Sequence, residues 1–118
     1  MKIKTIIFDF GGVITNSPIE GFKNLEKTHG YSKGLITGIN MNNPDNNAWA
    51  RSERGEIEID TFLSQFEQEA LEIGHDINAD EILIQLYGSP RPIMIKKIIS
   101  LSKSNKYKLI CLTNVLKG

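Results

Sequence analysis

The sequence has little of several features, and each shortage restricts its class. It contains a single cysteine, Cys111, so no disulfide can form within the chain and a disulfide-stapled secreted scaffold is excluded. No apolar stretch approaches the roughly 20 residues of a transmembrane helix. The first apolar run ends at Asp9, too early for a signal peptide. We therefore expect a cytoplasmic protein without a membrane partner, in which Cys111 is a buried and inert thiol.

An excess of charge of either sign is also absent. Fourteen basic residues balance fourteen acidic residues among 118, and 40% of the residues are hydrophobic, as in ordinary soluble domains. This balance provides no overall field that would attract nucleic acid. A local group of lysines is interpreted as the solvated face of a helix and its exit loop: Lys96, Lys97, Lys103, Lys106 and Lys108.

The most informative segment is the one that ends at Asp9 and continues into two glycines. Ile6, Ile7 and Phe8 are consecutive and apolar, which is typical of a strand buried on both faces of a parallel sheet. Asp9 ends this strand, where open α/β sheets bind their ligands. Gly11 and Gly12 permit a tight turn and bring backbone N–H groups close to an anion. The pattern predicts group transfer by a carboxylate nucleophile.

The rest of the chain alternates helical patterns with turn signals and returns to a strand. We predict strands over residues 4–9 and 106–113, and helices over residues 18–28, 31–40, 46–55, 57–74, 78–87 and 92–104. Asp45 or Asn46 is the expected cap of the third helix, and Asn78 that of the fifth. The helical interior is predicted to contain Phe22, Leu25, Phe62, Phe66, Leu83 and Leu86.

Three segments together resemble the haloacid dehalogenase-like hydrolases. The run from Phe8 to Val13, Phe-Asp-Phe-Gly-Gly-Val, resembles the first motif of that family, and Thr113-Asn114 resembles its second motif at a fitting separation. The segment from Glu53 to Glu58, with the amphipathic helix after it, resembles the cap of one subgroup. That subgroup includes sugar-phosphate phosphatases and the amino-terminal phosphatase domain of soluble epoxide hydrolases.

The resemblance implies an α/β fold with a partial Rossmann-like parallel core, made of the first two strands, and an inserted helical-bundle cap. The core would comprise residues 1–16 and 89–118, and the cap residues 17–88. In such a protein a small phosphorylated metabolite is the expected substrate, and the first strand carries the nucleophile.

The resemblance also implies roles for single residues. Asp9 is the expected nucleophile, which forms an aspartyl phosphate, and Mg²⁺ would be held by Asp9 and the Gly11 carbonyl. Gly12, Thr113 and Asn114 are the expected phosphate-binding residues. The structural alternative for Thr113 and Asn114 is a cap between a strand and a helix.

Two departures from the family pattern limit these implications. Gly11 stands where the family's phosphatases usually have a second aspartate, the general acid and base. Family members also continue past the second motif to a basic residue and an acidic pair, whereas this sequence ends at Gly118. We therefore interpret it as the amino-terminal portion of such a hydrolase, which holds Mg²⁺ weakly and turns over little. An unpaired core strand also predicts a homodimer through exposed strands or faces.

Two other functions remain open. One is a non-catalytic binding or interaction module derived from the same fold, and the other is a haloacid dehalogenase that uses the same nucleophile. Trp49 is predicted to pack in the core rather than line a substrate entrance. No role is assigned to His29 or His75.

Overall fold

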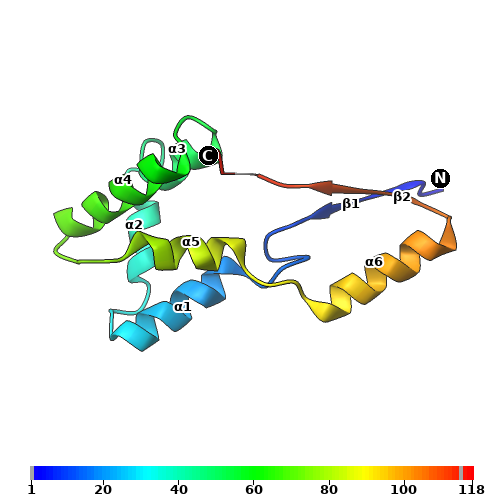
Figure 1. The fold of residues 1–118 in the computed structure, drawn as a ribbon, viewed down its shortest axis with the longest axis horizontal. Helices are drawn as coiled ribbons and strands as arrows, with labels where there is room; N and C mark the ends of the chain where they lie inside the picture. The colour runs from blue at the N-terminus through cyan, green and yellow to red at the C-terminus, as the bar shows by residue number, and fades with distance from the viewer. Residues whose placement is uncertain (1, 115) are drawn as a thin grey trace. The chain divides into compact units, whose positions relative to one another are not determined.

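The computed structural model describes residues 2–114 and 116–118, and these form an α/β fold (Figure 1). The elements, in chain order, are β1 (Thr5–Asp9), α1 (Pro18–His29), α2 (Leu35–Met41), α3 (Ala48–Glu53), α4 (Ile59–Glu72), α5 (Ala79–Tyr87), α6 (Pro92–Ser104) and β2 (Lys108–Leu112). The predicted fold class is confirmed: five helices are inserted after the first of two parallel strands, and a sixth leads back to the second strand.

The chain divides into two compact units. A strand unit is formed by residues 2–18 and 87–113, and a helical unit by residues 19–86, 114 and 116–118. The sequence predicted that residues 89–118 all belong to the core, but the last residues group with the helices. Lys117 pairs with Glu58, and its carbonyl accepts the Ile59 N–H at 2.7 Å. This pairing draws the end of the chain to the start of α4.

In the strand unit, β1 and β2 pair in parallel, with Thr5 opposite Lys108 and Asp9 opposite Leu112. β-branched residues favour the extended backbone of both strands. Pro92 begins α6 in the first helical turn, where its missing N–H costs nothing, and Asn105 ends it in the left-handed conformation. The helix thus returns the chain to the sheet so that both strands end at the same edge.

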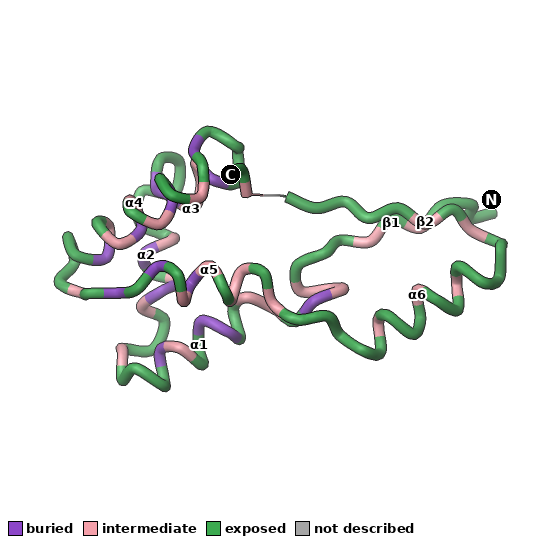
Figure 2. Tube along the Cα trace, viewed as in Figure 1, coloured by how far each residue is buried: buried purple, intermediate pink, exposed green. Residues whose placement is uncertain are grey.

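The strand unit has almost no core of its own. Thr15 is its only buried residue in the described part of the chain, and α6 buries none (Figure 2). Ile7 is 61% exposed and Leu112 is 68% exposed, although a parallel strand is normally covered on both faces. Cys111, expected to be buried, is also exposed, because no described element covers that part of the sheet.

The helical unit contains the hydrophobic core. Phe62 and Phe66, one turn apart on α4, have no exposed surface, and their rings lie 5.9 Å apart. The other buried apolar residues are Phe22, Ile36, Ile39, Ala48, Ile57, Ala70, Ile77, Ala79 and Ile82. Leu25, Leu83 and Leu86, predicted to be interior, are all only half-buried; Leu25 and Leu86 pack against this core, and Ile82 takes the interior position on α5.

Three glutamates on the longer helices cap the shorter helices. The buried carboxylate of Glu26 on α1 accepts the Gly34 and Ile36 N–H groups at the start of α2, at 2.8 and 2.9 Å. Glu69 and Glu67 on α4 accept the first N–H groups of α3 and α5, from Ala48 at 2.7 Å and from Ala79 at 3.0 Å. Negative charge at a helix amino terminus satisfies free donors and favours the helix dipole.

The side-chain caps differ partly from prediction. Asn47 caps α3, because its side chain accepts the Ala50 N–H at 2.8 Å, so neither Asp45 nor Asn46 has the predicted role. Asn78 does cap α5, by accepting the Asp80 N–H at 2.9 Å. Helix α2 begins at Leu35, later than expected, after Gly34 in the left-handed conformation.

The two units carry opposite charge. The strand unit contains eight basic side chains and one acidic side chain, a net charge of +7, and the helical unit contains six basic and thirteen acidic side chains, a net charge of −7. The net charge of zero for the whole sequence therefore conceals two units of opposite charge. The overall charge count could not show this division.

Replacing Phe66 with alanine tests the core. We expect Phe66→Ala to lower the free energy of unfolding by about 3–5 kcal/mol, because it opens a cavity between fully buried neighbours. Urea denaturation measures the loss. The control is Ile84→Ala on α5, where the side chain is 65% exposed and the expected change is below about 0.5 kcal/mol. Equal stability of the Phe66 variant and the wild type would show that the face of α4 that carries Phe66 is not in the core.

The exposed strand unit is expected to self-associate. A two-stranded sheet is marginal without further cover, so we expect a dimer in which strand edges or apolar faces of two copies meet. Two such units repel through their positive charge, so added salt should raise the dimer fraction by screening. Light scattering on dilute protein measures the mass. A monodisperse 13.3 kDa monomer at low and high salt, or large aggregates alone, would contradict this expectation.

Candidate functional site

Asp9 lies at the carboxyl end of β1 and is exposed. Its Oδ1 accepts the N–H of Phe10 at 2.8 Å. This bond orients the carboxylate against its own backbone. Among the described residues Oδ2 has no hydrogen-bond partner, so it is available for a ligand. An exposed carboxylate at this end of a parallel strand is in the expected position for chemistry on a bound molecule.

The loop after Asp9 is organised around one carbonyl. The N–H groups of three residues converge on the Phe10 oxygen, from Val13 at 3.2 Å, Ile14 at 2.9 Å and Thr15 at 3.1 Å. Thr15 is buried, and its hydroxyl also lies 3.5 Å from this oxygen. The loop is therefore a folded turn with its own hydrogen bonds, and Gly11 and Gly12 are part of it.

The two glycines differ in what the backbone requires of them. Gly12 has a φ of +80°, in the left-handed region that favours glycine. Its N–H donates to the Thr15 hydroxyl over a long 3.4 Å, so a phosphate oxygen would have to compete with a weak bond. Gly11 is exposed, and a Cβ there would meet no atom within 4 Å. Space alone would thus allow a side chain at position 11.

The segment that precedes α6 is bound to this loop. The Arg91 N–H donates to the Ile14 carbonyl at 2.7 Å, Thr15 and Pro90 form an antiparallel bridge, and the Asn16 N–H donates to the Ser89 carbonyl at 2.9 Å. The Arg91 guanidinium also reaches the Val13 carbonyl at 3.4 Å. The sequence analysis did not identify Arg91, because no local signal places residue 91 beside residue 14.

The second motif is only partly brought to Asp9. Leu112, the last residue of β2, pairs with Asp9, so Thr113 lies directly after the position opposite Asp9. Thr113 belongs to the strand unit, whereas Asn114 belongs to the helical unit. Asp9, Gly11, Gly12 and Thr113 therefore share one end of the sheet. The role predicted for Asn114 stays a prediction.

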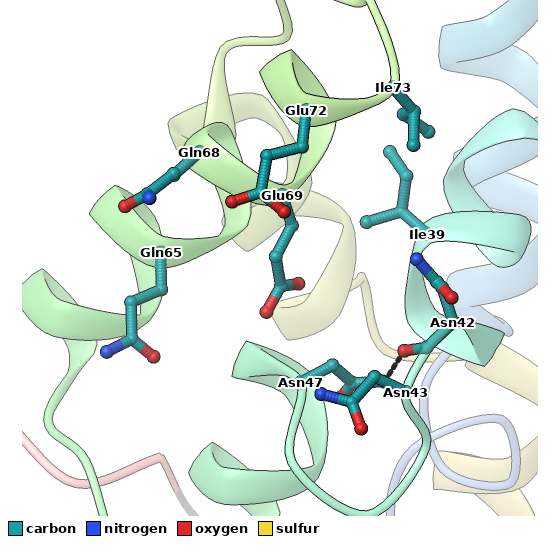
Figure 3. A pocket seen from close by; sticks show the side chains of 9 residues that line it. All are labelled: Ile39, Asn42, Asn43, Asn47, Gln65, Gln68, Glu69, Glu72 and Ile73. Carbon is teal, nitrogen blue, oxygen red and sulfur yellow. Dashed lines mark hydrogen bonds between the residues drawn. The ribbon is translucent and has the colours of Figure 1, made fainter.

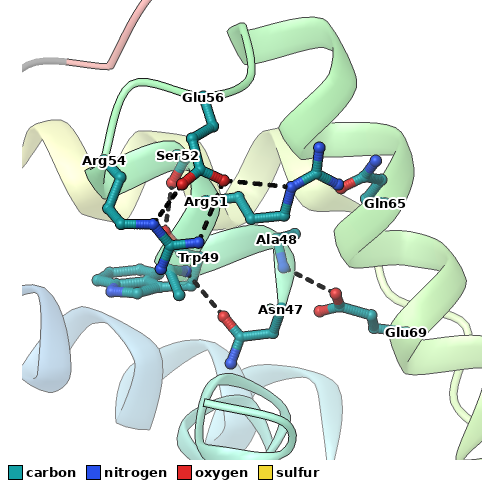
Figure 4. A network of polar contacts seen from close by, with 10 residues as sticks. Asn47, Ala48, Trp49, Arg51, Ser52, Arg54, Glu56, Gln65 and Glu69 are labelled. Carbon is teal, nitrogen blue, oxygen red and sulfur yellow. Dashed lines mark hydrogen bonds and ion pairs between the residues drawn. The ribbon is translucent and has the colours of Figure 1, made fainter. Parts of the chain in front are cut away.

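Trp49, Arg51 and Arg54 are part of the helical structure, as predicted for Trp49. Trp49 packs edge-on against Phe22, with ring centroids 6.0 Å apart. Arg54 pairs with Glu56, and their hydrogen bond raises the pKa of Arg54 and lowers that of Glu56. Arg51 donates to Gln65 at 3.1 Å, which joins α3 to α4 in the polar network of Figure 4. The contacts of Trp49, Arg51 and Arg54 therefore hold α3 in place within the helical unit.

The two histidines also have structural surroundings. His29 Nε2 lies 2.7 Å from a carboxylate oxygen of Glu81, and the ring stacks on Tyr31 with centroids 5.2 Å apart. The pair joins α1 to α5 within the helical unit. His75 lies just after α4 and its N–H donates to the Ala70 carbonyl at 3.0 Å, so it extends the end of that helix.

A polar cavity of about 290 Å³ lies between α4 and the segment that connects α2 to α3 (Figure 3). Its lining is formed by Ile39, Asn42, Asn43, Asn47, Gln65, Gln68, Glu69, Glu72 and Ile73. The lining contains two carboxylates and no basic side chain. A phosphate-bearing ligand would be repelled there, so this cavity is not the phosphate site that the sequence predicts.

Glu69 is the most constrained carboxylate of the cavity. One oxygen accepts the Ala48 N–H, whereas Oε2 is buried and has no hydrogen-bond partner among the described residues. Burial raises the pKa of Glu69 above its ordinary value of 4.5; the Ala48 hydrogen bond opposes this shift and the charge of Glu72 adds to it. Glu69 therefore stabilises α3 at the expense of a partly desolvated charge.

The metal expected at Asp9 has few ligands in the described residues. No group of three or more histidine, cysteine, aspartate or glutamate side chains there could hold a metal ion. Asp9 and the Gly11 carbonyl offer oxygen donors of the type that Mg²⁺ prefers, but Mg²⁺ requires near-octahedral coordination. These two residues fit the metal in donor type and fall short in number.

Two further findings bear on the class of protein. Within residues 2–114 and 116–118, no helix is both long enough and apolar enough to cross a bilayer. No family model matches the sequence, and no curated protein does either.

Among solved structures, the chain is similar to YfnB of Bacillus subtilis, a protein assigned to the HAD-hydrolases. That crystal structure, of an orthorhombic form bound to magnesium, reveals interdomain movement. The TM-score is 0.57 at 16% sequence identity, over 98% of this chain and 56% of YfnB. The chain thus spans little more than half the length of that protein, and at this identity the likeness shows the fold: a partial Rossmann-like core with an inserted helical cap.

Changing Glu69 tests the strain in the cavity. The pKa of Glu69 is higher in the folded than in the unfolded state, so the folded state binds more protons and loses stability as pH rises above 4.5. Glu69→Gln keeps an acceptor for Ala48 and removes the charge. We expect the stability of the variant relative to wild type to increase from about pH 4 to pH 7.5, as measured by urea midpoints.

The control is Glu72→Gln, since Glu72 is exposed on the same helix and caps no helix. It should change the pH dependence less than Glu69→Gln does. The stability difference between Glu69→Gln and wild type could instead be constant with pH, or the variant could become the less stable protein at neutral pH. Either result would show that the Ala48 hydrogen bond affects the pKa of Glu69 at least as much as burial does.

Proposed function

We propose that this chain is part of a haloacid dehalogenase-like hydrolase of phosphatase type, acting on a small phosphorylated metabolite through Asp9. The observation that carries the proposal is the position of Asp9. It is an exposed carboxylate at the carboxyl end of a parallel strand, followed directly by a folded glycine loop and paired with Leu112, the last residue of β2 before Thr113. The likeness to the fold of a HAD-hydrolase supports this assignment.

The chemistry follows from the available oxygen of Asp9. Oδ2 attacks phosphorus, a new P–O bond forms to the carboxylate, and the bond from phosphorus to the leaving oxygen breaks. The leaving oxygen takes its proton from water, because Gly11 offers no proton. Water then attacks the phosphorus of the aspartyl phosphate, which releases inorganic phosphate and restores Asp9. The N–H of Gly12 and the hydroxyl of Thr113 are the proposed donors to the phosphoryl oxygens.

A magnesium ion, when bound, would neutralise part of the phosphate charge, and Asp9 and the Gly11 carbonyl are the residues proposed to hold it. The structurally similar YfnB was determined with magnesium bound. With only these two donors, we expect weak Mg²⁺ binding and low turnover. Loss of a single electrostatic contributor commonly lowers a rate by about 10²–10³.

A non-catalytic interaction module is the second candidate. The observation in its favour is the strand unit, whose apolar side chains are exposed on the sheet and on α6. Hydrolysis of a carbon–halogen bond by the same Asp9 is a third candidate, and its assay differs from that for phosphatase activity. The cytoplasm is the proposed location, since the only cysteine is unpaired.

The test combines trapping with a gain of function. An aryl phosphate with Mg²⁺ should give turnover well below about 1 s⁻¹, while borohydride reduces the aspartyl phosphate at position 9 to homoserine with release of phosphate, and mass spectrometry detects the homoserine. Gly11→Asp installs a general acid in open space, so we expect the rate to rise at least about tenfold, within the usual contribution of such groups.

Asp9→Asn should abolish the trapped intermediate, and in the double variant Asp9→Asn/Gly11→Asp it should abolish the rate increase given by Gly11→Asp. The control is Asp60→Asn, which changes an exposed acid on α4 and should affect neither the intermediate nor the rate. Wild-type turnover above about 1 s⁻¹ that Asp9→Asn abolishes would contradict the low rate and indicate a complete site. Absence of phosphate at Asp9 would contradict phosphatase chemistry. Halide release from a 2-haloacid in that case would support the dehalogenase alternative.

A further inference from the structure

The only acidic side chain in the described part of the strand unit is Asp9 itself. Eight basic side chains share the unit with it, and the ion pairs found among the described residues all lie in the helical unit. Like charges held together without acidic partners raise the free energy of the unit. An anionic ligand would remove this cost, and the strand unit is also where the proposed phosphate chemistry takes place.

Four of these cations lie at or before the amino ends of the two strands: Lys2, Lys4, Lys106 and Lys108. Lys4 immediately precedes β1, and Lys108 pairs with Thr5 at the amino end of the sheet. Asp9 lies four residue steps along β1 from Thr5, which is about 13 Å at 3.3 Å per residue. This distance exceeds the Debye length of about 8 Å at physiological salt. The amino-end lysines can therefore attract an anion to the unit but cannot fix it beside Asp9.

Arg91 is different, because it is attached to the Asp9 loop. Its backbone N–H is bonded to Ile14, its neighbour Pro90 bridges Thr15, and its Nη1 donates to the Val13 carbonyl at 3.4 Å. These contacts hold the guanidinium against the turn that begins directly after Asp9. The side chain is exposed and forms no ion pair among the described residues, so most of its five donors can meet a ligand.

We propose that Arg91 binds an anionic oxygen of the substrate beside the Asp9 loop, and that it is the specificity-determining cation for a phosphorylated substrate. The proposal deepens the proposed function and rests on it for the identity of the anion. A planar guanidinium presents paired donors that match two phosphate oxygens, which a lysine ammonium cannot do. The acidic cavity of the helical unit cannot serve this purpose, since its lining has no cation.

The experiment measures inorganic phosphate binding to the full chain by the NMR shifts of the Gly11 and Gly12 amides. Arg91→Gln should weaken binding by about tenfold to a hundredfold, the usual effect of losing a charge-assisted hydrogen-bond pair. Arg91→Lys should retain part of the affinity, because it keeps the charge and loses the paired geometry. The variants should fold, since the backbone bonds of residue 91 do not involve its side chain.

Lys108→Gln is the matched control, because it makes the same change of charge in the same unit at the far end of the strand. It should weaken binding by about twofold or less. An equal effect of Arg91→Gln and Lys108→Gln would overturn the proposal, because the overall positive charge of the strand unit would then account for phosphate binding. Absence of saturable phosphate shifts in the wild type would also overturn it.

Asp9→Asn separates this inference from the proposed function. It should keep phosphate binding, with the same dependence on Arg91, because it removes the nucleophile and no anion donor. Failure to trap phosphate on Asp9, with Arg91-dependent binding intact, would reject the phosphatase mechanism and leave Arg91 as an anion-binding residue. Trapping at Asp9 that is equally efficient with Arg91→Gln at limiting substrate would reject the role of Arg91 alone.

Discussion

The helical unit depends on carboxylates from its two long helices to hold three short ones. Helices of six to nine residues are marginal by themselves, because nucleation costs more than a few hydrogen bonds return. Glu26, Glu67 and Glu69 each accept the first N–H groups of one such helix, so the long helices fix both the position and the direction of the short ones. The apolar core lies between the helices that these bonds connect.

The strand unit depends on a different constraint, the pairing of two segments that lie about a hundred residues apart in the chain. The register places Asp9 opposite Leu112, and the same pairing brings Thr113 to the end of the sheet. The segment around Pro90 and Arg91 is bonded to the turn after Asp9 before α6 begins. The candidate site is thus a product of sequence-distant hydrogen bonds, with little help from buried apolar surface.

Much of this architecture could be predicted from local patterns. The consecutive apolar residues before Asp9, the helical stripe through Phe62 and Phe66, and the Asn78 cap are all local signals, and the structure contains each of them. Leu83 was a harder case: Ile82 and Leu83 are adjacent, and only packing within the helical unit decides which one is buried. Periodicity alone cannot resolve neighbouring apolar residues.

The remaining misses share one cause, which is that tertiary contacts decide them. Glu26 lies on the same face of α1 as Phe22, an unusual place for a charge, and this was the one available hint of its capping role. Nothing near residue 91 indicated the bond to Ile14, and nothing near Lys117 indicated its pairing with Glu58. Cys111 is exposed because the sheet lacks cover, although its apolar neighbours predicted burial.

The exposed sheet has a consequence for the chemistry at Asp9. Ordering a residue costs about 1–2 kcal/mol of backbone entropy, and the ten strand residues bury no apolar side chain to offset that cost. The position of Asp9 is therefore stabilised by whatever covers the sheet, and anything that binds the ordered strand unit raises its population by mass action. Substrate binding at the loop and cover of the apolar faces should each strengthen the other, because both require the same ordered pair of strands. The geometry of the Asp9 carboxylate therefore depends on what covers the two strands, and the proposed nucleophile and the exposed apolar faces lie on the same pair of strands.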